Sequence, residues 1–209
     1  MKKLLLIGAL LSVLCSCGSS NNGAKKALTG THEDHEWVDL GLPSGLKWAT
    51  CNVDAKAPEA SGNYYAWGET TIKEIYLPET CTSSGQSWEN IGSDPSRDVA
   101  TAKWGGNWRM PTTAEFQELI DNCEWTWSEE NDNSGYKVTG PNGNSIFLPA
   151  AGYRYNSNRY AIDYQGYYWS SLPDNNSYMA SNLIFDDDAK YMEFRTRHWG
   201  YSVRPVLED

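Results

Sequence analysis

The chain has 209 residues with ten tryptophans and thirteen tyrosines but only four phenylalanines, and its formal net charge at pH 7 is −10. This length suits one domain with its own core. The acidic balance argues against nucleic acid as a partner, because phosphate binding needs a basic face, and against electrostatic docking on anionic lipid.

Residues 1–17 have the composition of a bacterial lipoprotein signal peptide. Lys2 and Lys3 precede an apolar run, Leu4–Leu14, that is too short to span a bilayer as a stable helix. Leu14-Cys15-Ser16-Cys17 resembles a lipobox, which makes Cys17 the predicted lipidation site. We expect an outer-membrane lipoprotein that meets the membrane only through its lipid, with the side it faces left open. The alternative is an ordinary secretory signal with incidental cysteines.

Residues 18–35 are predicted to be a flexible tether, and residues 36–209 the folded domain. The tether begins GSSNNGAKK, which has no periodicity and little to bury. Short strands are expected at Trp37–Leu42, Leu46–Val53 and Gly62–Gly68. A short helix is expected to begin with Asp94 as its N-cap before Pro95 and to end at Gly105.

The best-specified helix follows at Thr112–Cys123. Thr112 is the expected N-cap, and Glu115 completes a capping box with it. An apolar stripe at helical spacing is formed by Phe116, Leu119, Ile120 and Cys123.

The remainder of the chain has the pattern of strands. A hairpin is expected where Gly-Pro-Asn-Gly separates Tyr136–Thr139 from Ser145–Leu148. The other expected strands are Tyr167–Ser171, Met179–Phe185, Tyr191–Arg195 and Tyr201–Val206. Two helices among many short strands indicate an α+β fold with antiparallel pairing.

Several blocks of sequence resemble a known family. They are EWVDLGLPSGLKWATCNV, YYAWGET, ATAKWGGNWRMPTTAEFQELI, GYKVTGPNGNSIFLPAAGYR, YYWSS and GYSVRPV. Together they resemble the Fibrobacter succinogenes major paralogous domain, which is abundant in Bacteroides-type lipoproteins. The resemblance implies a C-type lectin-like domain with two helices, a twisted antiparallel sheet, and paired first and last strands. Two of the blocks also resemble segments of formylglycine-generating enzymes.

No catalytic residue, metal site or cofactor is predicted. Beyond the signal the cysteines are Cys51, Cys81 and Cys123. A Cys51–Cys123 disulfide and separately buried thiols both fit. A formylglycine-generating enzyme would need a reactive cysteine pair late in the chain, and none follows Cys123. The acidic run Asp186–Asp188 fits a solvated turn between strands better than a calcium site.

A segment rich in tyrosine, asparagine and arginine is the predicted ligand surface. Flat aromatic rings stack on sugar faces, and such loops also bind proteins. The candidate residues are Arg154, Tyr155, Arg159, Tyr160 and Tyr164, with Arg197 and His198 added on the resemblance alone. The alternative is that the aromatics are core residues of a sheet, which we expect of Tyr168 or Trp169.

These features predict a lipid-anchored protein of the cell envelope that acts as a non-catalytic binding module for a glycan or a surface protein. One alternative is an enzyme, or an enzyme remnant, related to formylglycine-generating enzymes. The other is a structural or adhesive surface protein.

Overall fold

The computed structural model describes residues 28–208, so Cys17 and the predicted signal peptide 1–17 lie outside the described part, as does most of the predicted tether. The first described strand is β1 (Thr29–His32), which falls inside the segment 18–35 that was expected to be a tether. Within residues 28–208, no helix is long and apolar enough to cross a membrane.

The predicted C-type lectin-like α+β fold is wrong. The described residues form a mostly β structure of thirteen strands in four sheets, and the α-helices α1 (Val99–Trp104) and α2 (Thr113–Asn122) are short. The first strand does not pair with the last. A tight turn at Glu33 and Asp34, both with positive φ, joins β1 directly to β2 (His35–Asp39). Most strands pair with the strand that precedes or follows them in the chain, and the strands are divided among several sheets.

The largest sheet has five strands in the order β1-β2-β3-β13-β4, in which β3 is Lys47–Ala49 and β4 is Trp108–Arg109. The C-terminal strand β13 (Val206–Leu207) therefore lies between two strands that are far from it in sequence. The predicted strand at residues 62–68 is instead irregular. It contacts the C-terminal segment through the bridge Tyr65–Tyr201 and through the N–H of Trp67, which donates to Arg197 O.

A second sheet contains β5 (Glu124–Glu130), β6 (Asn133–Thr139) and β7 (Ser145–Pro149) in chain order. The hairpin predicted at Gly-Pro-Asn-Gly is confirmed between β6 and β7. Strand β5 was not predicted. It alternates half-buried and exposed residues, and Trp125 and Trp127 pack edge-on against Tyr136.

A third sheet contains β10 (Gly166–Pro173), β11 (Met179–Phe185) and β12 (Lys190–Thr196), and α2 packs against it. The predicted acidic turn is confirmed between β11 and β12, where Asp186 Oδ1 accepts from the N–H groups of Asp188 and Ala189. The remaining sheet is a two-stranded hairpin of β8 (Tyr153–Tyr155) and β9 (Asn158–Tyr160).

The predicted helix start at Thr112 is confirmed, with the Thr112–Glu115 capping box in place and Phe116 and Leu119 fully buried. The predicted N-cap of the shorter helix, Asp94, is wrong. Asp98 caps α1 instead, because its carboxylate accepts from four backbone N–H groups, those of Ser93, Ala100, Thr101 and Met110.

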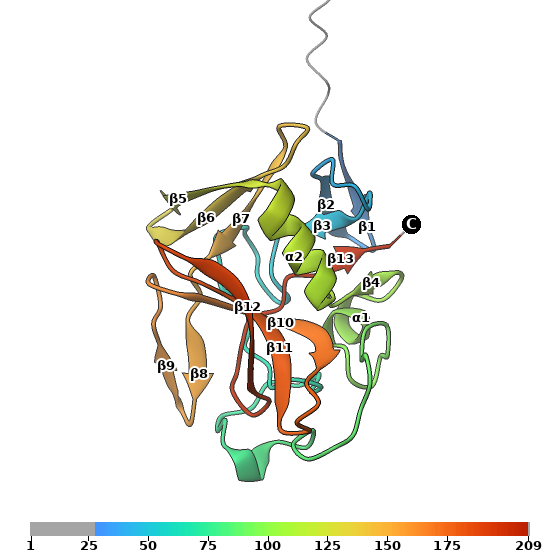
Figure 1. The fold of residues 1–209 in the computed structure, drawn as a ribbon, viewed down its shortest axis with the longest axis vertical. Coiled ribbons are helices and arrows are strands. Elements are labelled where there is room, and N and C mark those ends of the chain that lie inside the picture. Colours follow the sequence, from blue (N-terminus) through green and yellow to red (C-terminus); the bar gives the residue numbers. More distant parts are fainter. Residues whose placement is uncertain (1–27, 209) are drawn as a thin grey trace, which may run out of the picture.

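Two large hydrophobic clusters fill the interior. Trp67, Trp108 and Trp169 belong to the first cluster, and Trp48 and Phe116 belong to the second. In Figure 1 the described chain begins at the top of the molecule, whereas the β8–β9 hairpin lies on the left in the lower half and the short 3-10 helix Pro78–Thr80 lies at the bottom. The two ends of the long axis therefore carry different parts of the chain.

Candidate functional site

The aromatic segment of the predicted ligand surface folds into the β8–β9 hairpin. Its register pairs Tyr153 with Tyr160, Arg154 with Arg159 and Tyr155 with Asn158. Because side chains alternate along a strand, the three tyrosines share one face of the hairpin and the two arginines share the other. The segment's mixed composition thus separates into an aromatic face and a basic face.

Two tyrosines of the aromatic face form a stack of three rings with a tryptophan from outside the hairpin. Tyr153 lies between Trp199 and Tyr160, with centroid distances of 4.9 and 5.4 Å and interplanar angles of 11° and 23°. Tyr155 flanks the stack, 6.0 Å from the ring of Trp199. Tyr155 and Tyr160 remain 39% and 40% exposed, while Tyr153 and Trp199 are half-buried. We call these four residues the tyrosine face.

The hairpin is fixed to the body of the protein on the side away from β9. Arg154 and Gly200 exchange two backbone hydrogen bonds of 2.8 and 2.9 Å, and Tyr76 and Asn156 exchange two of 3.0 Å. The Arg154 guanidinium lies 5.3 Å from the centre of the Tyr76 ring and donates to Ser157 O. Arg154 therefore braces the hairpin from the face opposite the tyrosines.

The other predicted site residues divide between two places. Arg159 is exposed on the basic face of the hairpin, and Tyr164, 76% exposed, lies in the turn after β9. His198 lies beside Tyr155 with ring centroids 6.1 Å apart, and burial lowers its pKa. Arg197 is not part of this surface: its buried side chain lines a separate pocket. Tyr168 and Trp169 are buried, as expected of core residues.

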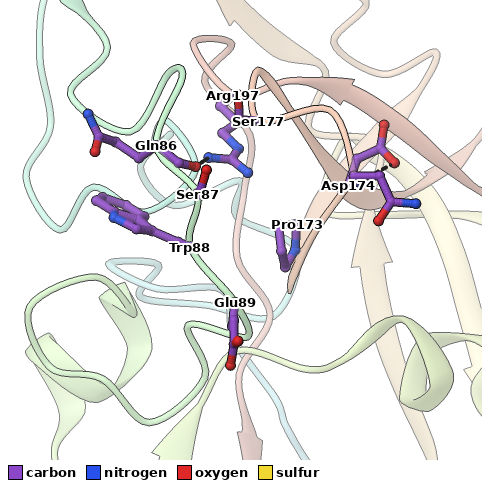
Figure 2. Close-up of a pocket in the computed structure, with 9 residues that line it drawn as sticks. Gln86, Ser87, Trp88, Glu89, Pro173, Asp174, Ser177 and Arg197 are labelled. Carbon is purple, nitrogen blue, oxygen red and sulfur yellow. Dashed lines mark hydrogen bonds between the residues drawn. The ribbon is translucent and has the colours of Figure 1, made fainter.

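That pocket has a volume of about 400 Å³ and was not predicted from the sequence. Figure 2 shows Trp88 and Pro173 on opposite sides of it. The polar residues along it are Gln86, Ser87, Glu89, Asp174, Asn175, Ser177 and Arg197. They come from residues 86–89, residues 173–177 and Arg197, which are far apart in the chain. A local sequence pattern therefore cannot predict the pocket. The one usable signal is a tryptophan within the long polar stretch that follows residue 68.

Arg197 is held in the pocket wall by neutral acceptors. Its Nε donates to Met179 O at 3.0 Å, and its Nη1 donates to Ser83 O and Gln86 O at 2.9 and 2.8 Å. The guanidinium also lies 4.3 Å from the centre of the Trp67 ring. Its Nη2 has no hydrogen-bond partner among the described residues. Burial lowers the pKa of Arg197, and the nearby Cys81 and Asp174 oppose this shift only in part.

A further titratable cluster, outside these two places, contains Asp54, Tyr65 and Lys103. The Tyr65 hydroxyl donates to Asp54, and Lys103 Nζ lies 3.1 Å from the same carboxylate. Burial and the neighbouring Asp54 raise the pKa of Tyr65 far above its usual range. A phenol held this firmly in its neutral form is poorly matched to proton transfer near pH 7.

The described cysteines Cys51, Cys81 and Cys123 are free thiols, which favours separate thiols over a Cys51–Cys123 disulfide. Burial, together with Glu118, raises the pKa of Cys123 to about 11. Its thiolate is therefore scarce at neutral pH. Within residues 28–208, no group of three or more His, Cys, Asp or Glu side chains is placed to hold a metal ion.

The model of a family described as a domain of unknown function (DUF8237) matches residues 117–206. The matched segment contains the β8–β9 hairpin, Trp199 and Arg197, but not Trp88. Comparison with the curated proteins returned no match, and comparison with the solved structures returned none. The chain is thus similar to this family over the part that carries the tyrosine face.

Proposed function

We propose that this protein is a non-catalytic binding module of the bacterial cell envelope, anchored by lipid at Cys17, whose tyrosine face binds a glycan. The observation that carries the proposal is the exposed outer end of the Trp199–Tyr153–Tyr160 stack. A flat ring supported from behind by two others presents an apolar plane to solvent, as the face of a pyranose requires.

Rigidity supports the same proposal. The backbone bonds from the hairpin to Gly200 and Tyr76 hold the rings in place before any ligand arrives. Little side-chain entropy is then lost on binding, so a small contact area can still give useful affinity. Asn156 and Asn158, exposed at the end of the hairpin, supply amide groups of the kind that hydrogen-bond sugar hydroxyls.

A protein partner is the second candidate, and Tyr164 favours it. This ring is far more exposed than Tyr155 and Tyr160 and belongs to the turn that follows β9. It extends the apolar surface of this region beyond the hairpin itself. Surfaces rich in tyrosine and asparagine are typical of protein recognition.

Alanine substitutions on the tyrosine face test the proposal. With a glycan identified on an array, Tyr160→Ala and Tyr155→Ala should each weaken binding by about 1–3 kcal/mol, the range for a hot-spot aromatic. The midpoint of thermal unfolding should change little in the same variants, because both rings are partly exposed. Tyr191→Ala is the matched control, since Tyr191 is similarly exposed on β12 and absent from this face.

Two results would count against the proposal. Large losses of stability at both positions, with unchanged binding by the folded fraction, would make these tyrosines core residues. A protein that ignores every glycan on the array but captures a surface protein through Tyr155, Tyr160 and Tyr164 would establish the second candidate instead.

A further inference from the structure

The fold contains two fully buried arginines, and it satisfies only one of them completely. Arg204 donates from Nε to Asn52 Oδ1, from Nη1 to Ala49 O and Thr50 O, and from Nη2 to Phe147 O at 2.9 Å and Pro58 O at 3.5 Å. All three of its nitrogens are therefore occupied. Arg197 has a similar cage of carbonyl oxygens around Nε and Nη1, yet its Nη2 has no acceptor in the described part of the chain.

An unpartnered nitrogen on a buried guanidinium is costly, because the desolvation of a charged donor is not repaid. Arg197 lies in the wall of the pocket between residues 86–89 and 173–177. In Figure 2 the guanidinium is directed into the space between the Gln86–Trp88 segment and Pro173. An acceptor seated in the pocket would complete the cage that the protein leaves unfinished.

The surroundings restrict what that acceptor can be. Asp174 and Glu89 also line the pocket, but Figure 2 shows both carboxylates pointing away from Arg197. Asp174 is occupied by the N–H of Asn175 at 2.7 Å. Two carboxylates near the rim disfavour a dianion such as phosphate more strongly than a monoanion. A single carboxylate is the anion that fits one free guanidinium nitrogen best.

The remainder of the lining suits a hydroxylated ring. The volume of about 400 Å³ is in the range of small-molecule sites. Trp88 and Pro173 offer apolar surface on opposite sides, while Gln86, Ser87 and Ser177 offer polar groups between them. One face of Trp88 is already covered by Arg97, whose guanidinium lies 4.2 Å from the ring centre. That contact orients the tryptophan before a ligand arrives.

We propose that this pocket binds an acidic monosaccharide unit of the uronic acid type, with the sugar carboxylate accepting a hydrogen bond from Nη2 of Arg197. The apolar side of the ring packs between Trp88 and Pro173, and the hydroxyl groups meet the polar side chains. The pocket is a second site, built from other residues than the tyrosine face, and it does not depend on the function proposed for that face.

Calorimetric titration of the folded protein with glucuronate, glucose and inorganic phosphate tests the assignment. Glucuronate should bind, and glucose should bind at least about tenfold more weakly, since it lacks the hydrogen bond between two charged groups, which contributes roughly that factor or more. Phosphate should also bind at least about tenfold more weakly, since Glu89 and Asp174 disfavour a dianion. Arg197→Lys removes Nη2 and should weaken glucuronate by a similar factor. Arg195→Lys is the matched control, because Arg195 is half-buried on β12 and does not line the pocket.

A second variant covers the case in which Arg197→Lys does not fold. Ser87 is exposed and lines the pocket, so Ser87→Tyr should fill the cavity without disturbing the Arg197 hydrogen bonds, and it should abolish glucuronate binding. Its thermal unfolding midpoint verifies that it is folded. Tyr160→Ala should leave glucuronate binding unchanged, which separates this site from the tyrosine face.

The proposal is overturned if the wild-type protein does not bind glucuronate, or if glucose or phosphate binds as well as glucuronate does. It is equally overturned if a folded Ser87→Tyr protein retains wild-type affinity for glucuronate.

Discussion

At the scale of single residues, two of the arginines within the recognisable sequence blocks are part of the scaffold. Arg109, in the block that leads into α2, forms a two-pronged ion pair with Glu115, with contacts of 2.6 and 2.9 Å, and also reaches Glu208 at 3.3 Å. Arg204, in the closing block, is caged by carbonyl oxygens from residues 49, 50, 58 and 147. Both side chains tie the C-terminal segment to distant parts of the chain.

Removal of the Arg204 side chain should therefore destabilise the protein strongly. Arg204→Met leaves several buried carbonyl oxygens and the Asn52 amide oxygen without a donor, and each such group costs about 1–3 kcal/mol. We expect the free energy of unfolding to fall by about 3 kcal/mol or more. Arg159→Met, on the exposed face of the hairpin, should change it by less than about 0.5 kcal/mol. Chemical denaturation of both variants checks the ranking, and equal losses would refute the carbonyl cage.

At the scale of the elements, α2 is the segment whose boundaries and buried face follow most directly from its residues. Its capping box satisfies N–H groups at the helix start, and its apolar stripe packs into the second hydrophobic cluster. The stripe and the cap contribute very different amounts to stability, because one involves burial and the other a hydrogen bond at the surface.

Two substitutions in α2 test this difference. Leu119→Ala should lower the free energy of unfolding by about 2–5 kcal/mol, since Leu119 is fully buried and a cavity would remain. Thr112→Ala should lower it by only about 1 kcal/mol, through the lost N-cap. Thermal or chemical unfolding gives both values. A larger loss for Thr112→Ala would show that the buried face of the helix has been misassigned.

Elements that are specified by a few adjacent residues were predicted correctly from the sequence. The capping box, the Gly-Pro-Asn-Gly hairpin and the acidic turn each depend on a few adjacent residues, and all three are confirmed. Asp98 was missed because Asp94 before Pro95 has the commoner N-cap sequence, while Asp98 is selected by a distant donor, Met110 N. Division of the strands among separate sheets depends on tertiary packing, so it is not visible in the sequence.

The candidate sites also combine features that the sequence shows with features that depend on tertiary packing. The tyrosine-rich segment was visible as composition, but the register that separates its tyrosines from its arginines required the structure. Arg197 and His198 are adjacent in sequence yet serve different places, since one lines the pocket and the other lies beside Tyr155. The pocket joins residues 86–89 to residues 173–177, a separation that no motif spans.

At the scale of the whole molecule, the described chain begins at one end of the long axis and the β8–β9 hairpin lies in the opposite half (Figure 1). From Cys17 to Leu28 the chain has eleven residue steps, which can span at most about 40 Å. A lipid at Cys17 would therefore keep the domain close to the membrane surface. It would also leave the hairpin end free to point away from that surface.

The anchor itself can be tested. Cys17→Ala should abolish incorporation of a radiolabelled fatty acid and release the protein from the membrane fraction, because the predicted acylation site is gone. Cys15→Ala is the matched control and should leave both unchanged. Undiminished labelling of the Cys17→Ala protein would refute the predicted anchor, whatever the binding surfaces do.

The central place of β13 has a consequence for the order of events in synthesis. The ribosome makes β3 and β4 well before the strand that lies between them, which consists of residues 206 and 207. Arg204, which closes the cage around the carbonyls of Ala49 and Thr50, is likewise made long after those residues. The five-stranded sheet and the arginine cage are therefore completed only once residues 204–207 have been synthesised. This part of the fold cannot form strand by strand in the order in which the chain is made.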